Sequence, residues 1–229
     1  MNDFLYPQYG YLLRCWKEGG EEEVKRSALA FLILAVLAFG ACMLLPDLRD
    51  MLFRLVTDMF SSLDLTDDNG NLSAFALLSN NLQACTMIML YGLIPFVHFT
   101  ALALGTNAML LGVLAAYYVT NSISMLAYMA ALIPHGIFEF PALILAFAMG
   151  LYVCGQLSRR CRHDETAVSL PECLLLIFRL LALVLLPLLA VAALSLQSRQ
   201  YANELNEKKQ SILSSLSAQG ENYDAFIKG

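Results

Sequence analysis

One hydrophobic stretch of the sequence contains a histidine and a carboxylate, the two side chains best suited to chemistry. If the chain is helical from Pro134 onward, His135 and Glu139 are four residues apart and lie on one face. The imidazole and the carboxyl could then share a proton or a hydrogen bond. Because ionisable side chains are costly at membrane depth, both are candidates for a functional role.

The residues around this pair predict an irregular backbone. Pro134 and Pro141 each have a fixed φ and no backbone N–H. Gly136 adds backbone freedom between them. Residues 122–156 form a hydrophobic stretch of about 35 positions, too many for one ordinary span and rather few for two. We therefore predict a broken, re-entrant helix at Pro134-His135-Gly136, with a half-crossing before the break and a full crossing after it.

Three asparagines in the preceding hydrophobic segments could extend the pair into a polar cluster. Asn80 and Asn81 lie near the start of one segment, and Asn107 lies within the next. Amide side chains hydrogen-bond across helices in lipid, so we expect a structural role for them ahead of ligand contact. The predicted cluster consists of His135, Glu139, Asn81, Asn107 and Asn80.

A metal site or a catalytic centre is not expected from these residues. The other two histidines are His98, predicted near the opposite surface, and His163, in a polar loop, so three metal ligands are hard to assemble. The sequence also lacks a Gly-rich phosphate loop and a nucleophile elbow. We predict no enzyme activity, no cofactor and no bound metal.

The composition predicts an integral membrane protein. The chain is 59% hydrophobic and only 14% charged, and its mean hydropathy is +0.62, outside the range of a soluble domain of this length. The net charge of -5 argues against a nucleic-acid partner. The six cysteines form no CxxC pair, which makes a disulfide framework unexpected.

Hydrophobic runs of sufficient length predict an all-α, polytopic membrane bundle with about five transmembrane helices. Residues 1–26 form a polar N-terminal segment, 27–196 the transmembrane domain and 197–229 a polar tail that we expect to be helical through Lys209. Within the domain, residues 47–73 read as an amphipathic helix followed by a turn at 66–71. The first predicted span, 27–46, precedes this helix, and four further runs follow it, at 74–97, 100–118, 122–156 and 174–196.

The positive charges predict the orientation in the cell membrane. The N-terminal segment carries Arg and Lys, and so does the short loop from Arg159 to Arg162, so both should be cytoplasmic. The aspartate-rich segment 47–73 and the C-terminal tail then lie outside. Arg179 lies one turn inside the last span, and we expect it to reach the headgroups.

Several motifs together resemble the stage II sporulation protein M family. The resemblance covers residues 74–157, and one departure is Ala108, where glycine follows the asparagine in many relatives. The motifs are Pro134-His135-Gly136-Ile137-Phe138-Glu139, Pro141-Ala142, Gly150-Leu151, Asn80-Asn81-Leu82, and Asn107 with Leu111-Gly112.

This resemblance implies a membrane scaffold. In endospore-forming bacteria, such a protein gathers a cell-wall amidase and a lytic transglycosylase into the peptidoglycan-degrading complex that drives engulfment of the forespore. The implied partners are therefore the lipid bilayer and cell-wall hydrolases, and association with further copies of the chain is compatible with the sequence.

Two functions from different classes stay open. In a scaffold, the polar cluster fixes how the helices pack, and segment 47–73 and the tail bind wall enzymes. In a transporter or channel component, the same cluster lines a path for a proton, ion or small solute. The halves of the sequence show no convincing internal repeat, which favours the scaffold.

Overall fold

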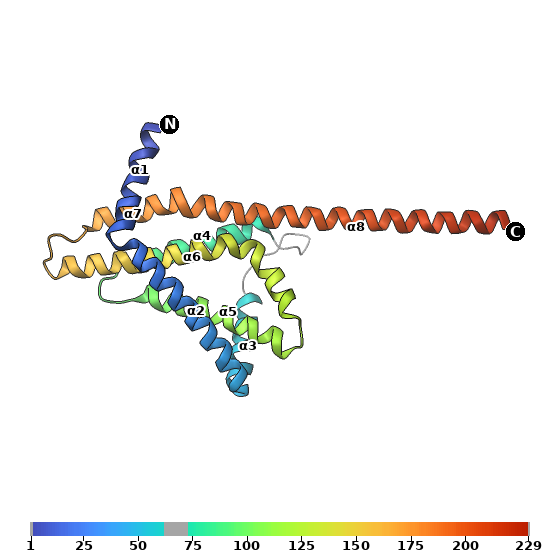
Figure 1. The fold of residues 1–229 in the computed structure, drawn as a ribbon, viewed down its shortest axis with the longest axis horizontal. Helices are drawn as coiled ribbons and strands as arrows, with labels where there is room; N and C mark the ends of the chain where they lie inside the picture. The colour runs from blue at the N-terminus through green and yellow to red at the C-terminus, as the bar shows by residue number, and fades with distance from the viewer. Residues whose placement is uncertain (1, 62–72, 229) are drawn as a thin grey trace.

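In a computed structural model, which describes residues 2–61 and 73–228, the chain folds into long α-helices (Figure 1). This confirms the prediction of an all-α, polytopic bundle. The expected turn at 66–71 lies outside the described residues. The elements are α1 (Asn2–Cys15), η1 (Trp16–Gly20), α2 (Glu21–Leu44), α3 (Pro46–Ser61), α4 (Ala74–Tyr91), α5 (Phe99–Thr120), α6 (Met125–Cys161), α7 (Leu170–Leu180), η2 (Leu181–Leu185) and α8 (Leu186–Lys228).

Four helical segments of the described chain are long and apolar enough to cross a membrane. They are Tyr9–Leu44, Phe99–Thr120, Gly136–Cys161 and Leu170–Leu194. The additional crossing expected at 74–97 corresponds to α4, which is 18 residues or about 27 Å long. The predicted number of about five is therefore approximate. Leucines such as Leu29, Leu32 and Leu37 point outward on α2, as lipid-facing side chains do.

The closest helix packing joins α2 and α5, because their contact faces carry small side chains. Ala108, Gly112 and Ala116 recur at every fourth position of α5 and are all buried. A Cβ atom on Gly112 would overlap the carbonyl oxygen of Ala35 in α2. Ala108, the departure from the family pattern, is 0% exposed and fits this contact with its methyl group.

The amphipathic helix predicted within 47–73 is α3. It packs its buried face, including Leu52 and Val56, against α2 and α5, where Cys42 and Val113 complete a small second core. Met51 and other apolar side chains of α3 remain exposed. The helix therefore leans on the bundle with one face and leaves apolar surface on the other.

Helix α6 changes direction where the sequence predicts a break. The chain stays helical from Met125 to Cys161, so the helix is not interrupted at this site. Figure 1 instead shows the yellow-green start of α6 bending away from its yellow remainder. Proline distorts a helix without always interrupting it, which explains a bend at this site. The first part packs on α5, where the Tyr128 hydroxyl donates to the Leu111 carbonyl at 3.1 Å.

The C-terminal helix is longer than the sequence predicts. A π-helical turn, η2, joins α7 to α8, and α8 continues to Lys228 instead of loosening after Lys209. Figure 1 shows its orange-to-red part extending well beyond the other helices. Within this segment each backbone N–H bonds to a carbonyl of the same helix. We call residues 195–228 of α8 the arm.

Two connecting loops meet at one end of the bundle. The Phe96 N–H, in a left-handed residue between α4 and α5, donates to the Ser158 hydroxyl at 2.8 Å, and the Arg162 guanidinium covers the Phe96 ring. In the loop after α6, Asp164 accepts hydrogen bonds from Thr166 and Arg159, which lower the pKa of its carboxyl to about 2. Both loops are thus fixed to the end of α6.

We predict that Gly112→Ala destabilises the bundle whereas Gly105→Ala does not. A methyl group at position 112 would force α2 and α5 apart, an overpacking cost of about 1–3 kcal/mol. A methyl group at Gly105, in the same helix, would meet no atom within 4 Å. Circular dichroism during SDS titration in mixed micelles gives both free energies of unfolding. Equal stability of the two variants would contradict the close contact.

Candidate functional site

The structure brings together two of the predicted polar residues, Asn81 and Glu139. The Asn81 amide Nδ2, on α4, donates to Oε1 of Glu139, on α6, at 2.9 Å. Both side chains are half-buried. The bond connects residues that are 58 positions apart, so it fixes α4 against α6. An amide donor also offsets part of the cost of a carboxyl group within a membrane-spanning helix.

Aromatic and small apolar side chains surround this bond. Phe140 follows Glu139 and packs against Phe31 of α2, with ring centroids 6.2 Å apart. Ala142 and Cys85, on the two bonded helices, are both 0% exposed. Gly136 is buried close to the Phe140 ring, where a Cβ atom would lie 2.8 Å from it. The glycine of the motif therefore makes room for an aromatic side chain.

The other predicted site residues are not joined to this bond by the contacts that are described. The Asn107 amide donates to the Ala103 carbonyl of its own helix at 2.9 Å. Asn80 is half-buried on α4 beside Asn81, and Pro141 is exposed on α6. The side chains of Pro134 and His135 lie outside the described residues, so the proximity of His135 to Glu139 stays a prediction.

The arrangement contains one carboxyl group and one amide. These groups suit a structural hydrogen bond or the transfer of a single proton. Among the side chains that the structure describes, which do not include that of His135, no three His, Cys, Asp or Glu side chains come together as metal ligands. The bond between the two side chains holds α4 against α6.

Sequence patterns missed two further polar contacts. The buried Thr100 hydroxyl donates to the Ile88 carbonyl at 3.1 Å, beside Gly150, whose added Cβ would lie 2.8 Å from both partners. The Gly150-Leu151 motif singled out this glycine but did not indicate which residues contact it. The guanidinium of Arg179 lies 4.3 Å above the Tyr11 ring, and nothing in the sequence pairs these residues.

The fold and this site define a multi-pass membrane protein made of α-helices. The model of the family described as Stage II sporulation protein M matches residues 27–195. The chain therefore belongs to this sporulation-related family of membrane proteins, and the resemblance found in the motifs is confirmed. No curated protein and no solved structure matches the chain.

We predict that Asn81→Ala lowers the free energy of unfolding by about 1–3 kcal/mol, because Glu139 loses its donor in a half-buried position. Asn107→Ala is the matched control and should cost less, because that amide bonds only to its own helix. SDS titration measures both. In a Glu139→Leu background, Asn81→Ala should cost little, and strictly additive losses would contradict the bond.

Proposed function

We propose that the protein is a membrane scaffold, not itself an enzyme, that recruits peptidoglycan-degrading enzymes of the amidase and lytic transglycosylase classes during engulfment. Family membership supports a sporulation-related role. The observation that carries the scaffold proposal is the arm of α8, which continues from the last membrane span away from the bundle (Figure 1). At 1.5 Å per residue it extends for about 50 Å, enough to reach a partner beyond the membrane surface.

An exposed apolar stripe on the arm supports a recruiting role. On the arm, Tyr201 and Leu205 are 61% and 71% exposed. They recur seven and then four residues after Leu194, the last residue of the membrane span, so all three share one helix face. The sequence continues the same spacing at Ile212 and Leu216. Wall hydrolases are the occupant that we propose for this stripe, since an amphipathic helix binds a partner through such a face.

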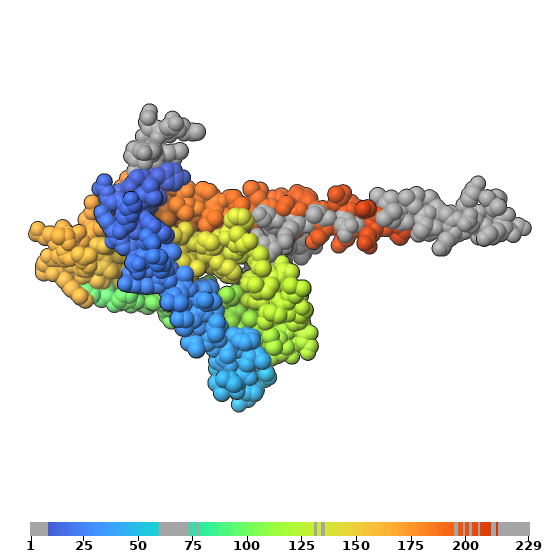
Figure 2. Space-filling model, viewed as in Figure 1, coloured from blue at the N-terminus to red at the C-terminus, as the bar shows by residue number. Residues whose placement is uncertain are grey.

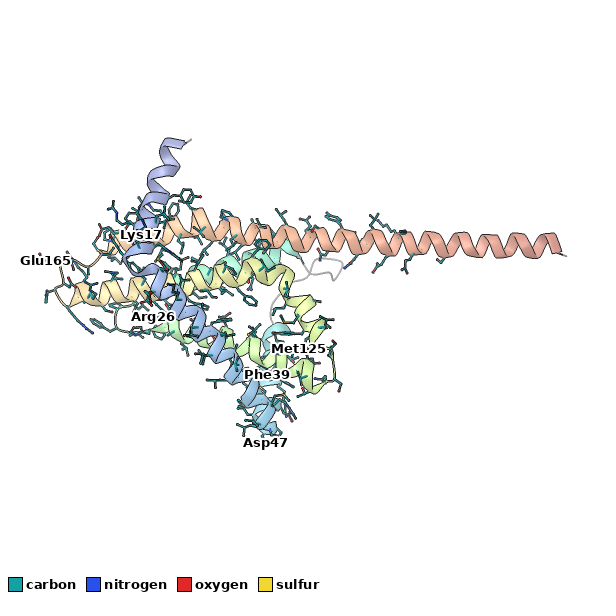
Figure 3. The ribbon with its side chains drawn as sticks, in the orientation of Figure 1. Lys17, Arg26, Phe39, Asp47, Met125 and Glu165 are labelled. Carbon is teal, nitrogen blue, oxygen red and sulfur yellow. The ribbon has the colours of Figure 1, made fainter. Side chains whose placement is uncertain are left out.

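The arrangement of charged segments supports the orientation that this role requires. In Figure 3, Lys17 and Glu165 lie toward one end of the bundle, and Asp47 and Met125 lie toward the other. The last turn of α6, which contains Arg159 and Arg160, thus shares an end with the basic N-terminal segment, and the arm leaves at the opposite end. With positive segments inside, the arm is extracytoplasmic.

Thiol labelling tests this orientation with a probe that the chain already contains. Cys161, at the end of α6, is exposed, whereas the other five cysteines are buried. We expect an impermeant maleimide to label the wild type only after membranes are permeabilised, and Cys161→Ser to remove that signal. Adding Glu204→Cys to Cys161→Ser should restore labelling in intact cells. The reverse pattern would invert the topology.

We predict that Leu205→Glu strongly reduces the capture of wall hydrolases by the purified protein, because a charge in the stripe opposes apolar contact. Asn203→Glu introduces the same charge at an exposed position on the opposite face and should leave capture unchanged. Pull-down with purified amidase and lytic transglycosylase measures both. Because neither residue contacts the bundle core, circular dichroism should show intact helices in each variant.

Equal capture by the wild type and Leu205→Glu would remove the arm from the proposal. The transport alternative is tested with Glu139→Gln, which keeps an acceptor oxygen for Asn81 but removes the charge. Ion flux into liposomes that occurs with the wild type and is lost in Glu139→Gln, without capture of hydrolases, would replace the scaffold with a transporter. A scaffold retains capture in the same variant.

A further inference from the structure

An apolar cavity lies between the N-terminal segment and the last membrane span. It has a volume of about 260 Å³, many times the ~10–15 Å³ that one water molecule needs on a comparable measure. Figure 2 shows the blue N-terminal segment crossing over the face made by α6 and α7. The lining comes from α1, η1, α2, α6, α7 and η2 and includes Leu12, Trp16, Met149, Tyr152, Leu180 and Val184. A cavity of this lining favours an apolar occupant over water.

A cation with an incomplete set of partners joins α1 and α7, two of the helices that line this cavity. Arg179 precedes Leu180, a lining residue, and its guanidinium covers the ring of Tyr11, which precedes the lining residue Leu12. The Nε atom of Arg179 is buried and finds no hydrogen-bond partner among the residues that the structure describes. The sequence predicts that this side chain reaches the headgroups, and in the described chain its guanidinium lies on the Tyr11 ring with one donor unsatisfied. A buried, unpaired donor on a charged group is costly, so the position suits an anionic ligand.

We propose that the cavity holds an acyl chain of an anionic phospholipid whose phosphate lies on the guanidinium of Arg179. The planar fork of arginine binds phosphate oxygens in pairs, and the cavity receives the tail attached to that phosphate. Free phosphate would leave the apolar space empty, and a neutral lipid would leave the cation without a net counter-charge. The bound lipid joins α1 to α6 and α7, in a region where the helices deviate from regular geometry at η1 and η2.

Native mass spectrometry of the full chain in a mild detergent tests the headgroup contact. Titration with phosphatidylglycerol should show one lipid per chain, bound at least about tenfold more tightly than phosphatidylcholine with the same tails. Arg179→Gln should abolish this preference. Arg162→Gln removes an exposed arginine that also covers an aromatic ring, Phe96, and should preserve it. Arg179→Lys, which keeps the charge without the fork, should retain an intermediate preference.

A second pair of variants tests the tail contact. Ala148 lines the cavity and is 3% exposed, so Ala148→Leu should fill part of the space and weaken both lipids. Gly155→Leu adds a larger side chain on the exposed face of the same helix and should change neither affinity. Equal binding of both lipids by the wild type would overturn the proposal, whatever the variants do. The proposal would also be overturned if inorganic phosphate stabilised the protein as much as phosphatidylglycerol does.

Discussion

The backbone contact between α2 and α5 at Gly112 is the constraint on which the rest of the bundle depends. In lipid, large apolar side chains gain little by turning inward, so association depends on close packing of small residues. Ala35, Ala108 and Gly112 provide that contact, and leucines on α2 face outward. Helix α3 then packs on the surface that α2 and α5 form together. The Gly92–Gly150 contact brings α6 against the end of α4 in the same way.

Polar groups within the bundle follow from this packing, because each must find a partner where water is scarce. Thr100 donates to a carbonyl of α4, and Asn81 donates to Glu139 of α6. These bonds determine which helices are neighbours and in which register. Among the described residues, Ser27 Oγ and Arg179 Nε are exceptions, since neither has a hydrogen-bond partner, and a bound lipid phosphate would complete Arg179. Asn81, Gly112 and Gly150 of the family motifs thus act through packing and hydrogen bonding between helices.

In the proposed scaffold, the bundle holds the protein in the membrane and the arm carries the binding surface. Glycine and alanine contacts hold the helices of the bundle together, and the continuous helix of α8 carries an exposed stripe away from it. Family membership alone fixes the fold more firmly than the partners, because the same fold can carry different sites. The proposed function therefore rests on surfaces such as Tyr201 and Leu205, which are largely exposed.

The sequence by itself determined that the chain crosses the membrane several times as helices, since long hydrophobic runs leave the backbone no other way to satisfy its hydrogen bonds. Its motifs also predicted the family and the importance of Glu139 and Asn81. Only the tertiary structure decided that these two side chains bond to each other while Asn107 bonds within its own helix, because a shared face depends on how helices rotate. It likewise decided that the proline segment of α6 bends without ending the helix, because neighbouring helices hold both parts. The pairing of Arg179 with Tyr11, far apart in the chain, has no local signal and arises only when α1 lies against α7.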